Sequence, residues 1–189
     1  KLTIDFLYLD LNTCERCKGT ESNLLKAINE VEVVLKAASC EILINKINID
    51  SKESAIKYKF ISSPTIRING RDIDTNRKES DCKDCGDICG DSIDCRVWTY
   101  ENNEYTEPPK AMIINAIFKE IYNDKIKETN EIKEEYVFPE NLEKFFKLNN
   151  HKTTKNRVCN LSIICSFTFL GVTITPLRNN LFQKLVAAN

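Results

Sequence analysis

Hydrophobic positions in the first part of the chain alternate between strand-like and helix-like spacing. Residues 2–11 form an apolar run typical of a buried central strand. From residue 20 to 38, apolar side chains recur every three or four positions, which predicts an amphipathic helix. Residues 40–49 return to a strand pattern, and a short helix is predicted to begin at Asp50-Ser51. The pattern therefore predicts a β-α-β-α unit.

A proline introduces the next predicted strand. Because proline fixes φ and has no amide hydrogen, Pro64 suits the first position of a strand over residues 65–68. Asn69-Gly70 is typical of a type I′ hairpin turn. A further strand is predicted over residues 96–100, and an amphipathic helix begins near residues 108–109. The predicted order for this domain is β-α-β-α followed by β-β-α.

The domain is predicted to span residues 1–128, with a C-terminal extension over residues 129–189. Pro139 is expected to open a short helix in this extension that presents Leu142, Phe145 and Phe146. Residues 158–177 carry no charge and are long enough to span a bilayer. Their alternating apolar and polar residues instead favour strands. A strand-like arm, a membrane anchor and a disordered tail all stay open for this segment.

Charge and composition narrow the function classes. The chain has 27 basic and 28 acidic residues, so there is no electrostatic reason to expect a nucleic-acid partner. With one histidine, His151, any metal site must rest on the nine cysteines. A secreted disulfide scaffold is usually shorter and denser in cysteine, so we expect a cytoplasmic protein, with exported or membrane-anchored forms still open. Cys40 stands alone and is predicted to be a small buried hydrophobe.

Cys14 and Cys17 form a CxxC pair between the first strand and the first helix. Their sulfur atoms are predicted to lie one helical turn apart, close enough to form a disulfide or to share a soft metal ion. Free amides at a helix N-terminus favour the thiolate of Cys14, which we expect to be the more exposed and more reactive thiol. Arg16 is the predicted modulator of the thiol pKa values.

This strand–CxxC–helix unit, with Ser63-Pro64 before the third strand, resembles the thioredoxin-like superfamily over roughly residues 2–125. The Cys14–Cys17 motif lacks the Gly-Pro pair and the preceding aromatic residue of thioredoxin itself. The resemblance implies an α/β sandwich with a cis Ser63-Pro64 bond beside the redox pair. It also implies Cys14, Cys17 and Pro64 as catalytic residues, no required cofactor, and a protein or small-molecule disulfide or thiol as partner.

A cysteine-dense insertion occupies about residues 79–95, between the third and fourth predicted strands. It carries Cys82, Cys85, Cys89 and Cys95 in a polar context. We expect these four thiols to converge, as a zinc site or as two local disulfides. A thiol arm that exchanges with the first CxxC pair is a further alternative. The spacing of the four cysteines disfavours an iron–sulfur cluster.

Three functions follow from these motifs. The first is a thiol-disulfide oxidoreductase in which Cys14 attacks a disulfide and Cys17 resolves the intermediate. The second is a thiolate protein that binds a soft ion such as zinc, copper(I), arsenite or mercury(II). The third is a structural module in which the cysteines only stabilise the fold. The sequence predicts the first of these and names neither substrate nor reductant.

Overall fold

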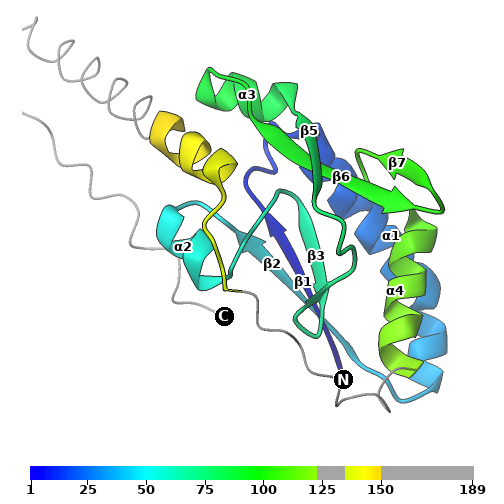
Figure 1. Ribbon diagram of the computed structural model, residues 1–189. Helices are drawn as coiled ribbons and strands as arrows, with labels where there is room; N and C mark the ends of the chain where they lie inside the picture. The colour runs from blue at the N-terminus through cyan, green and yellow to red at the C-terminus, as the bar shows by residue number, and fades with distance from the viewer. Residues whose placement is uncertain (123–134, 150–189) are drawn as a thin grey trace, which may run out of the picture. The chain divides into compact units, whose positions relative to one another are not determined.

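The computed structural model describes residues 1–122 and 135–149, which form a mixed α/β structure with two sheets (Figure 1). All of these residues belong to a compact unit that spans Lys1–Lys152. A second unit, Thr153–Asn189, lies outside the described residues, and so does the uncharged segment 158–177. Among the described helices, none combines the length and apolar character needed to cross a membrane.

The first sheet has four strands in the order β2-β1-β3-β4. Strands β1 and β2 are parallel, with Leu2 opposite Ile42, whereas β3 is antiparallel to both β1 and β4. A parallel pair needs a long crossover, which the helix α1 provides. The elements are β1 (Leu2–Tyr8), α1 (Glu15–Ala37), β2 (Ile42–Asn48), β3 (Thr65–Ile68) and β4 (Arg71–Asp72).

Helices cover both faces of this sheet. Because strand side chains alternate between faces, Leu2, Ile4 and Phe6 of β1 are buried in one cluster with residues of α1 and α4 (Lys110–Tyr122). Leu7 is buried in a second cluster that includes Ala55 of α2 (Lys52–Lys57). Figure 1 shows α1 and α4 side by side on one side of the sheet and α2 on the other. The hydrophobic core therefore consists of two clusters, one on each face of the first sheet.

Several local signals in the sequence are confirmed. Ser51 caps α2 in a capping box with Ser54. Asn69 and Gly70 both have positive φ angles, 50° and 82°, as the turn between β3 and β4 requires. The Ser63-Pro64 peptide bond is cis, as expected.

The second sheet contains the cysteine-dense insertion. Its strands are antiparallel in the order β5-β6-β7, with β5 (Lys78–Asp81), β6 (Asp94–Tyr100) and β7 (Asn103–Tyr105). Between β5 and β6 lies a short helix, α3 (Lys83–Cys89), which ends at Gly90 with φ of 83°. Glycine suits this left-handed position because it has no Cβ. The hydrophobic pattern of the sequence does not predict α3.

Arg96 ties the second sheet to the first. Its backbone amide donates to the carbonyl oxygen of Ser63 (2.8 Å). Its buried guanidinium donates to both carboxylate oxygens of Asp72 (2.7 and 2.9 Å) and lies 4.5 Å from the ring centroid of Trp98. A buried charge is tolerated when it is paired and hydrogen-bonded in this way. Strand β6 is therefore fixed against β3 and β4.

A helical segment over residues 140–149 follows Pro139, as predicted. Its apolar side chains Leu142, Phe145 and Phe146 are buried in the same cluster as Cys14 and the cysteines of the insertion. Before the helix, the hydroxyl of Tyr136 donates to the carbonyl oxygen of Phe60 (2.9 Å). This segment packs on the cysteine-containing part of the core.

Candidate metal centre

Two CxxC motifs, each at the start of a helix, contribute to one cluster of thiols. Cys14 is the N-cap residue of α1, and Cys82 is the N-cap residue of α3. Cys17 and Cys85 follow one helical turn later in each motif. The amide of Gly86 donates to the carbonyl oxygen of Cys82 (2.9 Å), which closes the first turn of α3. The same local structure thus presents cysteine at both helix N-termini.

Three sulfur atoms in this cluster are arranged as metal ligands would be. The Sγ atoms of Cys14, Cys82 and Cys85 all lie within 4.8 Å of one another, and all three residues are buried. A zinc ion with Zn–S bonds of about 2.3 Å in tetrahedral geometry separates its sulfur ligands by about 3.8 Å. A small inward movement of these side chains would therefore suffice to bind such an ion.

Cys95, on β6, is positioned as a fourth ligand. Its thiol donates to the sulfur of Cys85 at 3.3 Å and is fully buried. Its thiol also interacts with those of Cys14 and Cys82, although its sulfur is not one of the three that all lie within 4.8 Å of one another. Four soft sulfur ligands without histidine or carboxylate suit zinc and softer ions.

Cys17 is a fifth sulfur with different neighbours. It contacts the thiol of Cys14, and its Sγ atom lies 3.4 Å from the Oγ atom of Ser63. That Oγ atom also accepts a hydrogen bond from the amide of Leu9 (3.2 Å), which fixes the Ser63 side chain. The residue next to Pro64 therefore contacts the CxxC pair.

Cys89 was predicted to converge with the other three insertion cysteines, but the structure places it beside the helical segment 140–149. Its thiol donates to the carbonyl oxygen of Phe145 at 3.6 Å, on the helical segment 140–149. The structure brings Cys82, Cys85 and Cys95 together and adds Cys14, which the sequence pattern assigned to a separate redox pair. The cluster therefore includes three of the four insertion cysteines, whereas Cys89, at the end of α3, contacts the helical segment 140–149.

The expected exposure of Cys14 is wrong. Cys14 and Cys17 are both 0% exposed, although a helix N-terminus alone would leave the first thiol open to solvent. The insertion covers this N-terminus, since the amide of Glu15 donates to the carboxylate of Asp84 in α3 (2.8 Å). The cysteines of the insertion and Ile93 are accordingly buried in the core, whereas polar residues such as Lys83 and Asp87 stay exposed.

Arg16 attaches the insertion from the other side. Its guanidinium donates to the carbonyl oxygens of Ser80 (3.2 Å), Asp81 (2.6 Å) and Cys95 (3.3 Å). It also donates to the hydroxyl of Ser80 (3.1 Å). Each of these acceptors lies on β5 or β6. The residue between the two cysteines of the first motif therefore positions the strands that carry the second.

The cluster favours one thiolate, at Cys14. The hydrogen bond from Cys17 and further contacts with Cys82, Cys85 and Cys95 hold the pKa of Cys14 far below its usual range, despite burial. The hydrogen bond to Cys14, together with burial, raises the pKa of Cys17. For Cys82 the contact with Cys14 raises the pKa, but the contacts with Cys85 and Cys95 lower it to about 7. The groups that lower the pKa of Cys14 are thus neighbouring thiols.

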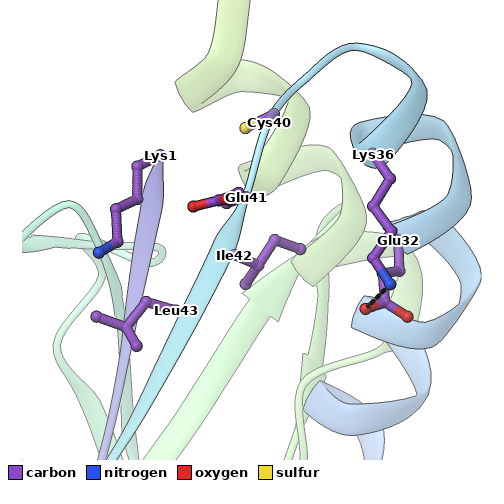
Figure 2. Close-up of a pocket in the computed structure, with 7 residues that line it drawn as sticks. All are labelled: Lys1, Glu32, Lys36, Cys40, Glu41, Ile42 and Leu43. Atoms are coloured by element: carbon purple, nitrogen blue, oxygen red, sulfur yellow. Dashed lines mark ion pairs between the residues drawn. The ribbon is translucent and has the colours of Figure 1, made fainter.

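A surface pocket at the opposite end of the first sheet contains Cys40 (Figure 2). Its volume is about 310 Å³, and it is lined near the start of β1 and β2 by Lys1, Glu41, Ile42 and Leu43. In the same pocket Glu32 forms an ion pair with Lys36 (2.8 Å). One cysteine beside paired surface charges is not a soft-metal site. The clustered thiols lie at the other end of the sheet, where β1 leads into α1.

Fold and site together define a mixed α/β protein with a buried centre of cysteine thiols. Residues 2–117 match the model of a family described as a domain of unknown function (DUF2703), and the chain belongs to this family. An uncharacterized protein from Archaeoglobus fulgidus is 32% identical over 100 residues, which cover 51% of this chain and 71% of that relative. No solved structure matches the chain. The matched family region includes all five clustered cysteines.

Sequence reasoning missed the contacts that assemble the centre. Arg16 and Asp84 act through acceptors and donors far away in the sequence, so no local pattern identifies them. The pairing of Cys14 with Cys82 and Cys85 did have a signal, because both motifs have CxxC spacing. Two CxxC pairs separated by a long stretch of chain are the usual arrangement of a structural zinc site.

Proposed function

We propose that this protein binds a soft metal ion through Cys14, Cys82, Cys85 and Cys95. The observation that carries the proposal is the group of three buried sulfur atoms within 4.8 Å of one another. Cys95 adds a fourth buried sulfur, which lies 3.3 Å from that of Cys85. The ligands come from both CxxC motifs, so the ion would join α1 to the insertion. Zinc is the first candidate, and copper(I), arsenite and mercury(II) share the preference for thiolates.

Burial favours this function over disulfide exchange with a protein substrate. A catalytic thiol has to reach the substrate disulfide, and reactive cysteines are partly exposed. Cys14 is fully buried beneath an insertion that Arg16 and Asp84 attach to the helix N-terminus. Metal ligands need no such exposure. A thiolate site would also remain available in the reducing cytoplasmic compartment expected from the sequence.

Metal titration of the reduced full-length chain tests the proposal. With cobalt(II) or cadmium(II) as the probe, we expect one ion per chain and strong thiolate-to-metal charge-transfer absorption. Cys14→Ser and Cys85→Ser should each lose most of this absorption. Cys40→Ser is the matched control, because this cysteine lies in the pocket at the other end of the sheet. Absence of binding by the reduced wild type, or equal loss in the Cys40→Ser variant, would contradict the proposal.

A thiol-disulfide oxidoreductase remains the second candidate. The contact between Cys14 and Cys17 favours it, as does the lowered pKa of Cys14, since the thiolate is the attacking species. Ser63, directly before the cis Pro64, also contacts Cys17, as the resemblance to thioredoxin-like proteins implies. Turnover of a dithiol–disulfide couple by the metal-free protein, lost in both Cys14→Ser and Cys17→Ser, would support this function instead.

We further propose that residues 1–122 have a thioredoxin-like fold. The supporting observations are the sheet order β2-β1-β3-β4 and the position of Cys14 after β1. The antiparallel pairing of β1 with β3, immediately after Pro64, also supports it. The second sheet and α3 would then be an elaboration of that fold. An experimental structure compared with thioredoxin-like proteins tests this assignment.

A further inference from the structure

We propose that the metal centre is redox-gated: a disulfide between Cys14 and Cys17 releases the bound ion. This inference rests on the proposed metal-binding function and concerns its regulation. Five thiols converge at the centre, whereas a tetrahedral ion uses four. Cys17 is the sulfur left over, and the residue that it contacts, Cys14, is a ligand.

Cys14 is both a proposed metal ligand and one half of a CxxC pair. It cannot bind the ion as a thiolate and form a disulfide with Cys17 at the same time. As a thiolate it joins Cys82 and Cys85, with all three sulfurs within 4.8 Å. As one half of a CxxC pair it interacts with Cys17, whose sulfur lies 3.4 Å from the Oγ atom of Ser63. A disulfide sulfur carries no negative charge and binds metal poorly. Oxidation of the pair would therefore remove the ligand that links α1 to the insertion.

The chemistry balances with a small-molecule disulfide as the oxidant. The sulfur of Cys14 attacks one sulfur of the oxidant, and the oxidant's S–S bond breaks to expel one thiolate. Cys17 then attacks the sulfur of Cys14 in this mixed disulfide and expels the second thiolate, while the proton of Cys17 passes to a leaving thiolate. Two protein sulfurs lose two electrons, and the oxidant becomes two thiols. The thiolates of Cys82, Cys85 and Cys95 take up protons as the ion leaves.

Burial restricts which oxidants reach the pair, and thermodynamic linkage couples metal binding to the redox state of the pair. Because both cysteines are 0% exposed, any oxidant needs a local opening of the insertion over Cys14, and a small disulfide needs a smaller opening than a folded protein substrate does. An ion that binds only the reduced centre must, by linkage, stabilise the reduced form of the pair. The midpoint potential of the Cys14–Cys17 couple should therefore rise when zinc is present.

Another pair in the centre competes for the same role. The sulfurs of Cys85 and Cys95 lie 3.3 Å apart, and a disulfide between them would also remove ligands. The two alternatives differ in their dependence on Cys17. Contact with Ser63 keeps Cys17 outside the ligand group, so Cys17→Ser leaves the four proposed ligands intact.

Oxidation of the zinc-loaded full chain by 2-hydroxyethyl disulfide tests the gate, with a chromophoric chelator that reports released zinc. We expect wild type and Cys40→Ser to release one ion per disulfide formed, and peptide mapping to identify a Cys14–Cys17 link. Cys17→Ser should bind zinc when reduced and retain it through the same treatment. Release from Cys17→Ser at the wild-type rate, or a mapped Cys85–Cys95 disulfide, would overturn the gate alone. Failure of reduced wild type to bind zinc would overturn the metal function and the gate with it.

Discussion

Arg16 connects the two cysteine motifs although its position suggested a different role. The sequence placed it between Cys14 and Cys17, where a cation would tune the thiol pKa values. In the structure its guanidinium donates to carbonyl oxygens on β5 and β6 and so positions Cys95. Hydrogen bonds that involve a charged donor are stronger than neutral ones. The effect of Arg16 on the centre is therefore one of positioning.

Replacing Arg16 by methionine should weaken the attachment of the insertion. The variant keeps much of the apolar stem but leaves the carbonyl oxygens of Ser80 and Asp81 without this donor. We expect the free energy of unfolding of the reduced protein to fall by about 1–3 kcal/mol, as measured by urea denaturation. Lys18→Met, in the same helical turn, removes only a surface ion pair with Glu15 and should leave the free energy of unfolding nearly unchanged. Equal losses in the two variants would contradict the positioning role.

At the residue scale, local chemistry was predictable and long-range contacts were not. The CxxC spacing predicted Cys14 and Cys17 as a reactive pair, which stays a prediction, and the polar stretch singled out the insertion cysteines. Which sulfurs meet depends on how α3 packs, and this packing involves residues from distant segments. The position of Cys89 could not be predicted in this way, because its neighbour Phe145 lies far along the chain.

The helices around the centre differ in how strongly their own sequences specify them. The helix α1 has a regular apolar stripe, and α2 begins directly after Ser51, where the sequence predicted it, so both were predicted. The helix α3 has seven residues, among them one glycine and two cysteines, which have low helix propensity. Its formation depends on burial against the rest of the core. Sequence pattern alone therefore suggested a loop.

The helix over residues 140–149 should contribute measurably to stability, because its apolar face covers the thiol cluster. Leu142 is 1% exposed, so Leu142→Ala leaves a cavity and should lower the free energy of unfolding by about 2–5 kcal/mol. Val137→Ala is the control, since that side chain is 79% exposed and its loss should change stability by about 0.5 kcal/mol or less. Thermal or urea denaturation of the two variants gives the comparison. Similar stability in both variants would show that the helix does not pack as described.

At the scale of the whole molecule, the centre joins parts of the chain that are far apart in sequence. The first CxxC motif follows β1, whereas the second lies in the insertion between β5 and β6. Holding these distant segments together costs chain entropy. An ion bound by cysteines of both motifs would help to offset that cost. The order of β1, α1, β2, α2 and β3 was predictable from the sequence, whereas α3 was not. The meeting of the two motifs was not, because it depends on how one sheet packs against the other.

X-ray absorption spectroscopy of the stoichiometric zinc complex tests the central claim most directly. For wild type and for Cys17→Ser we predict a first shell of four sulfur atoms at about 2.3 Å from zinc. For Cys95→Ser we predict three sulfur atoms and one oxygen or nitrogen atom. A first shell of oxygen and nitrogen in the wild type, or a four-sulfur shell that loses a sulfur in Cys17→Ser and not in Cys95→Ser, would contradict the proposed centre.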